Sequence, residues 1–595
     1  MRNSPTAEPS FAARTRWVGT AAICIVLATV SVQAQFQLSQ RVAGAADWPE
    51  GEVNTGLVLD TNNNCYLTGW FDGTNNFGGS TLTNQSIAGS DIFVAKYNST
   101  GALQWAQRAG GTGINYGRAA GVDSNGSIYV TGGYQGPASF GGVNLPVTSG
   151  EQFFLAKYSS SGSVQWVKTS TNGSDDNYGI GLTVDGAGNS YALAVMDHSG
   201  ASLTFGSITV TTTKLGYTLL VLVKYDNAGT AQWVRLFDST AETYGSKLAA
   251  DASGNVYVRG SFDSDMTIGS SNLVVSSGST MNMFIAKFSS AGNLIWVQTP
   301  QGGDVGEGGV AVDAGANVYV SGAFDTNLNF GGGIILTNLA VFGDAFLAKY
   351  NSAGAIQWAK AAGGTNGGFY WDVALDGATN VYAAGFLGQF AAVAKYNSAG
   401  APQWVYSATG LPGDPVASTA TKCAVDAAGH CYLAGAYQGV AAFWTNALGP
   451  QDSWNFFLAE ATTNPAVQFT ANPNGGTVPL TVQFNSGSTD NQGNTISTWR
   501  WNFGDGGVSS LQNPSHTYTN VGTFYPGFIA TNNHGVAVLG YGAPVSTWTP
   551  SAADFTYITN NGGLTVTGYI GSNSQVIIPS TANGWPVTAI GDGAF

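Results

Sequence analysis

The chain contains few charged residues, and most of them are acidic. Of its 595 residues, 9% are Asp, Glu, Lys or Arg, and 20 basic against 34 acidic side chains give a formal net charge of −14. A field of this sign repels nucleic-acid phosphates and anionic lipids, so nucleic acid is excluded as an expected partner. A hydrophobic content of 44% and an aromatic content of 12% still suffice for packed cores, so the low charge does not indicate disorder.

Residue types that commonly carry catalysis or bind metals are also scarce. The four histidines fall on different predicted elements with no nucleophile beside them: His198, His430, His516 and His534. Glycine-rich stretches such as 331–333 read as loops, and there is no phosphate-cradling loop. Repeated Asp-x-x-Gly-Asn segments, such as 185–189, suit either tight hairpin turns or calcium, and the turn is the simpler interpretation. We therefore expect no cofactor and no metal, and no catalytic constellation indicates an enzyme.

Cysteine is rare, and the odd number left after removal of the N-terminal segment cannot form a complete set of disulfides. One of four cysteines lies in the N-terminal apolar segment, which leaves Cys65, Cys423 and Cys431. Cys423 and Cys431 flank a predicted hairpin turn and could lie within disulfide distance. Alternatively, all three are small buried hydrophobic residues. Zinc binding with His430 is disfavoured, because adjacent residues of a strand point to opposite faces.

Long hydrophobic runs are absent except near the N-terminus. Residues 17–32 are apolar, follow Arg14 and Arg16, and lead to small residues before Ala34. The run is short for a membrane span, which needs roughly 20 apolar residues. We predict a signal peptide over 1–34 with cleavage after Ala34, and an uncleaved anchor is the alternative. The mature chain is then secreted or at the cell surface, without a transmembrane span.

What the chain has in abundance is one phrase: a short apolar strand, a tight turn and a tryptophan. Its first copy spans 95–105, and further copies follow at intervals of 46 to 67 residues, with Lys at 96, 157, 224, 287, 349 and 395. A fixed phrase at such a period marks a repeat architecture. We expect each tryptophan to pack between neighbouring repeats, because aromatic side chains bury large areas.

Each repeat contains four strand-like segments, as at 309–312, 318–324, 345–350 and 356–360. Four short antiparallel strands per repeat describe a propeller blade. The second- and third-strand phrases occur seven times, and the seventh copy lacks a fourth strand. Residues 36–44 align with the fourth strand at 103–111 and would supply it. The sequence therefore predicts an all-β fold whose first domain, 35–462, is a seven-bladed β-propeller closed by its N-terminal strand.

This region resembles the seven-bladed propellers with SBBP-type repeats of secreted bacterial proteins, a family defined by blade structure rather than by catalytic residues. Beyond it, 499–506 (WRWNFGDG) and 513–518 (NPSHTY) resemble the motifs of a PKD domain, an immunoglobulin-like β-sandwich, assigned to 463–548. Asn502 departs from the Asp usual in that motif. The resemblance implies a spacer or binding module of extracellular proteins.

The last segment, 549–595, resembles the beginning of a BspA-like leucine-rich-repeat region, notably at 576–580 and 587–595. Such solenoids need at least three stacked repeats to bury a core. We therefore expect this sequence to be a fragment that stops within the first repeat.

The candidate ligand site lies in the segments whose length and sequence differ between repeats. The segments between second and third strands are long and variable, and variable loops on a rigid scaffold commonly carry function. Aromatic residues leading into the first strands, with nearby acids, would ring the channel mouth on that face and suit a carbohydrate or a cationic group. Packing between blades with solvated acids is the alternative. The candidate residues are Trp48, Tyr116, Tyr178, Tyr244, Tyr370, Asp175, Asp176, Asp304 and Glu307.

These observations favour a non-enzymatic extracellular or cell-surface recognition or adhesion protein that binds a polysaccharide or protein. One alternative is a polysaccharide lyase or hydrolase at the channel mouth, which would need paired carboxylates within reach of each other. Another is a structural envelope component.

Overall fold

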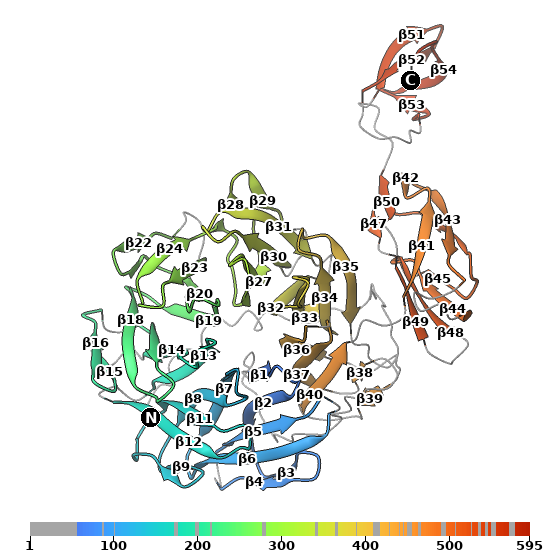
Figure 1. Cartoon of the computed structure of the whole chain (residues 1–595). Helices are drawn as coiled ribbons and strands as arrows, with labels where there is room; N and C mark the ends of the chain where they lie inside the picture. Colours follow the sequence, from blue (N-terminus) through green and yellow to red (C-terminus); the bar gives the residue numbers. More distant parts are fainter. Residues whose placement is uncertain are drawn as a thin grey trace, which may run out of the picture. The chain divides into compact units, whose positions relative to one another are not determined.

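The computed structural model describes residues 56–594 as an all-β chain with no helix among them, and a boundary between two compact units falls between Thr463 and Asn464 (Figure 1). The description omits 86–88, 100, 172–175, 197–201, 215–216, 276–280, 339–342, 363–366, 388–389, 408–416, 428, 439–440, 444–445, 449–454, 462–465, 489–494, 506, 525, 533–536, 542–544, 549–554 and 571–577. The predicted signal peptide, the closing strand at 36–44, Trp48, Asp175, His198 and His534 lie outside the described residues.

The first unit consists of antiparallel meanders, each named below by its first strand. The β1 sheet contains β1 (Gly56–Leu59), β2 (Cys65–Phe71), β5 (Asp91–Tyr97) and β6 (Leu103–Gly111). The β7 sheet contains β7 (Asn115–Val122), β8 (Ile128–Tyr134), β11 (Gln152–Tyr158) and β12 (Val164–Thr171). The β13 sheet contains β13 (Tyr178–Val184), β14 (Ser190–Met196), β17 (Leu219–Tyr225) and β18 (Ala231–Ser239).

The same order continues along the chain. The β19 sheet contains β19 (Thr243–Ala250), β20 (Val256–Phe262), β23 (Asn282–Phe288) and β24 (Leu294–Gln298). The β26 sheet contains β26 (Val310–Val312), β27 (Val318–Phe324), β30 (Asp344–Tyr350) and β31 (Ile356–Ala362). The β32 sheet contains β32 (Gly368–Leu375), β33 (Val381–Leu387), β34 (Phe390–Tyr396) and β35 (Pro402–Ser407). The β36 sheet has three described strands, β36 (Ala417–Val425), β37 (Cys431–Gln438) and β40 (Asn455–Ala461).

The core lies between successive sheets. Second and third strands such as β8 and β11 are buried along their whole length, because each of their faces packs against a neighbouring sheet. Each first strand contacts the next first strand, and β1 contacts both β7 and β36. Leu57 and Tyr97 share a core cluster with Tyr432 and Leu458. The sheets thus surround a centre lined by first strands, a propeller-like arrangement (Figure 1).

Most of the segments between second and third strands are not irregular loops, and the sequence did not predict their structure. Most contain a short hairpin, and β9 (Ala138–Phe140) pairs with β6 of the preceding sheet. In the same way β15 (Ser202–Phe205) pairs with β12, and β21 (Met266–Ile268) with β18. An added strand covers the outer edge of the preceding sheet, which would otherwise expose unpaired backbone groups.

Five of the hairpins bury a large apolar side chain directly before a glycine. These residues are Phe77, Phe140, Phe205, Ile268 and Phe330. The other hairpin strands are β3 (Thr74–Asn76), β4 (Thr81–Thr83), β10 (Val143–Asn144), β16 (Ile208–Thr211), β22 (Ser271–Leu273), β28 (Leu328–Gly331), β29 (Ile334–Leu336), β38 (Ala441–Phe443) and β39 (Asn446–Leu448), with β25 (Gln301–Gly302) as the partner of β28.

The second unit begins with two packed sheets. One has the order β45-β44-β48-β49-β41-β43-β46 and the other β42-β50-β47. Their bounds are β41 (Ala466–Asn472), β42 (Gly475–Thr477), β43 (Leu480–Ser486), β44 (Ile496–Asn502), β45 (Val508–Ser509), β46 (Ser515–Tyr518), β47 (Gly522–Phe524), β48 (Gly527–Asn532), β49 (Ala537–Tyr541) and β50 (Val545–Trp548). Trp501 is fully buried at the centre, against Phe469 and Phe528.

The motif residues of this sandwich contact one another. The Tyr518 hydroxyl donates to the Phe503 carbonyl at 2.9 Å, and His516 Nε2 lies 2.7 Å from Asp505 Oδ2. His516 stacks on Phe503 with ring centroids 4.1 Å apart. The motif is therefore a structural link between β44 and β46.

The chain ends in a small sheet of order β51-β52-β54-β53, with bounds β51 (Phe555–Asn560), β52 (Gly563–Tyr569), β53 (Thr581–Ala582) and β54 (Trp585–Ile590). Phe555, Val566 and Ala594 form its core cluster, and Leu564 and Ala582 are also buried. The leucine-rich-repeat assignment of this segment stays a prediction. Across the described part of the chain, no helix is long and apolar enough to cross a membrane.

Candidate functional site

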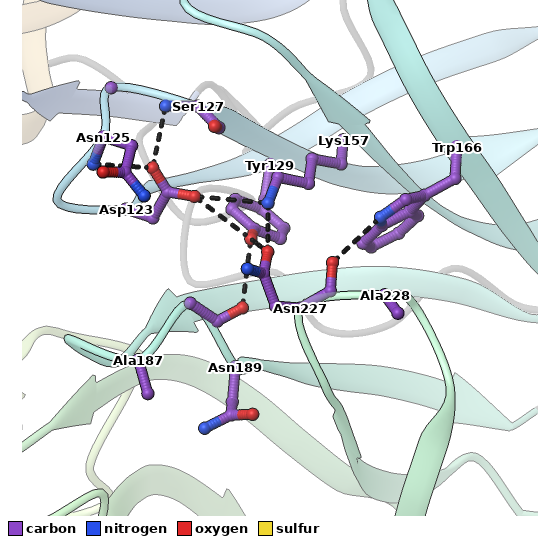
Figure 2. A network of polar contacts seen from close by, with 12 residues as sticks. Asp123, Asn125, Ser127, Tyr129, Lys157, Trp166, Ala187, Asn189, Asn227 and Ala228 are labelled. Carbon is purple, nitrogen blue, oxygen red and sulfur yellow. Dashed lines mark hydrogen bonds and ion pairs between the residues drawn. The ribbon is translucent and has the colours of Figure 1, made fainter.

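The tight turns between first and second strands carry a polar network that recurs in the ring, shown for one pair of sheets in Figure 2. Asp123 Oδ1 accepts from the backbone amides of Asn125 at 3.0 Å and Ser127 at 2.9 Å, which shapes the turn. Its Oδ2 lies 3.3 Å from Lys157 Nζ and 3.3 Å from the Tyr129 hydroxyl. Both Lys157 and Asp123 are buried, so the carboxylate is occupied by structural contacts.

The same network joins neighbouring sheets. Trp166 Nε1 donates to the Asn227 carbonyl of the β13 sheet at 3.2 Å, and the Tyr129 hydroxyl lies 3.0 Å from the Gly188 carbonyl (Figure 2). Equivalent indole-to-carbonyl bonds join Trp105 to Ser160, Trp233 to Ser290, Trp296 to Ser352 and Trp358 to Ser398. The prediction that the repeated tryptophan packs between repeats is confirmed.

The hydrogen bonds of this network change the pKa values of its members, as in the turn that contains Asp251. Burial opposes ionisation of Asp251, yet hydrogen bonds from Asn255, Tyr257 and Ser253 hold its pKa below the usual value. The pKa of Tyr257 is raised, first by burial and then by this carboxylate. The scaffold therefore favours the ionised form of the Asp251 carboxyl.

Two of the candidate aromatic residues, Tyr116 and Tyr178, are brought together by a residue that sequence reasoning missed. The Arg118 guanidinium lies 4.9 Å from the Tyr116 ring centre and 4.1 Å from that of Tyr178. Arg118 also pairs with Glu151. Both tyrosines are half-buried, whereas Arg118 is buried. The group joins two adjacent first strands through cation–π contacts and one ion pair.

Tyr370 does not belong to this set, and its prediction as a ligand residue is wrong. Each first strand from β7 onward, other than the short β26, has a β-bulge, which in β32 lies between Tyr370 and Asp372. Counted from the bulge, Phe369 is the equivalent of Tyr116, and Tyr370 occupies the position of Gly117. A shift of one residue reverses the direction of a strand side chain. Tyr370 is accordingly fully buried, with its hydroxyl 3.2 Å from that of Tyr396.

Most of the described candidate acids form hydrogen bonds to the preceding sheet. Asp176 accepts from the Glu151 amide at 3.2 Å, and Asp304 accepts from the Met281 amide at 3.2 Å. Glu242 makes the equivalent bond to the Thr218 amide at 2.9 Å. These carboxylates cap the third strand of the preceding sheet, which agrees with the packing alternative. Glu307 is exposed, and Tyr244 is half-buried.

A second cluster lies one position beyond the bulges. Lys247, Asp372 and Lys422 each directly follow the extra residue of their first strand, on β19, β32 and β36. Lys247 Nζ lies 3.1 Å from Asp372 Oδ2, and the same oxygen accepts from the Cys423 amide at 3.1 Å. Asp372 is buried, whereas Lys247 and Lys422 are partly accessible. Three strands separated in sequence thus place two amines and one carboxylate together.

Lys422 is the most perturbed group of this cluster. Burial and the neighbouring Lys247 lower its pKa to about 7, while Asp372 and Glu307 act in the opposite direction. Arg259, fully buried on β20, donates to the Gly306 carbonyl. Burial lowers its pKa to about 9 against the attraction of Glu307. A desolvated amine beside a second cation can bind an anion or act as a neutral amine.

The cysteines form no bridge. Cys423 and Cys431 are both free and buried, and so is Cys65. Cys423 pairs with Leu433, while Cys431 pairs with Val425, so the two cysteines are not opposite each other. The disulfide interpretation is thus wrong, and the buried-residue alternative holds. Burial also raises the pKa of Cys423 well above that of an exposed thiol.

Comparison with known proteins adds limited likenesses. The chain is 25% identical over 413 residues to an uncharacterized WD repeat-containing protein of Acanthamoeba polyphaga mimivirus. The match covers 57% of this chain but only 30% of that relative. Among solved structures, a fungal alcohol oxidase of the AA5 family aligns at 10% identity, with a TM-score of 0.36 and coverage of 83% and 96% of the two chains. A gluconolactonase from Xanthomonas campestris aligns at 12% identity, with a TM-score of 0.25 and coverage of 56% and 90%. Likenesses this weak do not bear on function.

The second unit gives a family match that confirms the motif-based interpretation. The matched segment contains both the buried Trp501 and the Asp505–His516 contact described above. PKD domains are typical of extracellular proteins. Residues 462–539 match the PKD domain family.

Proposed function

We propose that this protein is a non-enzymatic, extracellular recognition protein that binds a polysaccharide at the inner strands of its ring. In this proposal the ring is a seven-bladed β-propeller closed by residues 36–44, and the chain reaches the cell exterior through the signal peptide at 1–34. The PKD domain is consistent with that location.

One observation carries the proposal. The repeated turn aspartates and tryptophans have structural partners, whereas the first strands hold two groups that do not repeat. These are the Arg118 group, with Tyr116 and Tyr178, and the Lys247–Asp372–Lys422 cluster. Aromatic faces beside charged side chains are a usual composition for a carbohydrate site. Positions that break a repeat while the scaffold around them is kept are where specificity can reside.

The test is a glycan-array screen of the full mature chain, followed by product analysis on every glycan that binds. We expect binding without turnover, and a loss of binding in Tyr178→Ala. The matched control is Gln104→Ala, because Gln104 is an exposed residue of the outer strand β6. Turnover of a bound glycan would contradict the non-enzymatic assignment. Binding to a protein partner but to no glycan would replace the proposed ligand class.

A further inference from the structure

We propose that Lys247, Asp372 and Lys422 form a binding site for a single carboxylate group, such as that of a uronic acid. This inference rests on the proposed function and names the chemistry of its ligand. It is carried by the position of the three residues, by their charge and by their accessibility.

The three residues occupy one structural position, directly after the bulge of a first strand, but the residue type at this position differs between sheets. The residue directly after the bulge is Ala119 in β7, Gly181 in β13, and charged in β19, β32 and β36. Gly309, which precedes β26, lies against β32: a Cβ there would meet the Val373 nitrogen at 2.5 Å. This close approach of neighbouring strands allows Lys247 to reach Asp372 across the intervening sheet, at 3.1 Å.

The charges are unequal. Both oxygens of Asp372 already have donors: Oδ1 accepts from the Val373 amide at 3.0 Å, and Oδ2 from the Cys423 amide and Lys247. Two carboxylates, Asp372 and Glu307, therefore act on three cations, Lys247, Lys422 and Arg259. Burial and the neighbouring Lys247 lower the pKa of Lys422 to about 7, because Asp372 and Glu307 offset them only in part. A further carboxylate between the amines would supply the missing charge through charge-assisted hydrogen bonds.

Both lysine side chains are partly accessible. The Lys247 side chain retains 24% of its exposure, and Lys422 is half-buried, whereas Asp372 retains 7%. Part of each lysine side chain is therefore exposed while the existing carboxylate stays covered, and this is the side from which a small carboxylate would approach. The Arg118 group, by contrast, has its cation paired with Glu151 and covered by two rings.

Binding at this site is coupled to a proton. The charged and titratable groups around Lys422 are Lys247 on β19, Asp372 on β32, Cys423 on β36 and Glu307 before β26. A bound carboxylate favours the charged amine, so the complex takes up a proton above pH 7. Affinity is then highest below pH 7 and falls by up to about tenfold per pH unit above it, until the raised pKa of the complex is reached.

The experiment is calorimetric titration of the full mature chain with glucuronate, acetate and glucose at pH 6.5 and 8.5. Two buffers of different ionisation enthalpy measure the proton uptake. We expect both carboxylates to bind more tightly at pH 6.5 and glucose to bind no more tightly than either. Equal affinity for acetate and glucuronate supports a site for any small carboxylate, and tighter glucuronate binding supports an acidic sugar.

Three variants separate the site from general effects. Lys422→Met removes binding, Lys422→Arg keeps the charge and binding but loses the proton uptake, and Lys360→Met is the control, because Lys360 is an exposed residue of β31. Should Lys422→Met fail to fold, the Arg variant alone decides. Unchanged glucuronate affinity in Lys422→Met, or proton uptake that persists in Lys422→Arg, overturns the inference. Neutral-glycan binding that is insensitive to Lys422 overturns it too but leaves the proposed function standing.

Discussion

The indole clasp between sheets can be tested most sharply at Trp233, which is only 8% exposed. Its Nε1 donates to the Ser290 carbonyl at 3.1 Å, and its ring lies 5.9 Å from that of Tyr191. Trp233→Ala removes a buried aromatic side chain and should reduce stability by about 3–5 kcal/mol. Trp233→Phe keeps most of the buried area and removes one of two donors to the Ser290 carbonyl, because Lys224 Nζ still donates to it at 2.9 Å, so we expect a loss of about 0.5–1.5 kcal/mol.

The measurement is amide hydrogen exchange across a urea series, followed at the 289–293 turn and at β18. These segments contain both sides of the clasp, so they report its loss even though the chain has two compact units. Gln232→Ala is the matched control, because Gln232 adjoins Trp233 in sequence and its side chain is exposed. The effect of this control on stability should stay within about 0.5 kcal/mol. If Trp233→Ala exchanges like Gln232→Ala, the clasp contributes nothing and the reasoning fails.

Three further outcomes follow from the same structure. Lys157→Met leaves the buried Asp123 carboxylate without its cation and should cost about 3–5 kcal/mol in urea unfolding, whereas Lys360→Met should be neutral; equal midpoints would contradict the network. Asp60, Asp251 and Asp376 have lowered pKa values, so their stabilisation is present above about pH 4 and is lost as pH falls below it; a thermal midpoint that is unchanged from pH 7 to pH 3 would contradict this. Cys65, Cys423 and Cys431 are buried thiols, so a thiol reagent should label none of them in the native mature chain and all of them in urea. Labelling of Cys65 alone in urea would indicate a bridge between Cys423 and Cys431.

The sequence predicts the meanders well because their signals are local. Valine, tyrosine and phenylalanine runs between Asp- and Gly-containing turns indicate each strand, and the recurrent tryptophan indicates contact with the next repeat. The hairpins were missed since strands of three residues, such as β9 and β21, are too short to show a periodicity. Their signal was present in Phe77, Phe140 and Phe205, each followed by a glycine.

The candidate site was predictable only in part, and for geometric reasons. Tyr116 and Tyr178 lie together as the shared repeat position suggested, but Tyr370 is one residue nearer to the shared bulge than they are and therefore points to the other face. Lys247 and Asp372 are 125 residues apart and carry no shared motif. Only the circular arrangement of first strands brings them into contact, and no spacing rule along the chain contains that information.

The indole clasp has a direction, and this has a consequence for assembly. Every tryptophan bond described runs from a sheet to the one that follows it, so each sheet presents a donor side and a different acceptor side. In the terms used for oligomers, these are head-to-tail interfaces, which form a closed ring only when the rotation per unit is correct. A chain cut between two sheets would have one unmatched donor side and one unmatched acceptor side. Two such pieces should therefore reassociate in a single orientation, and a chain with an added sheet should join others end to end.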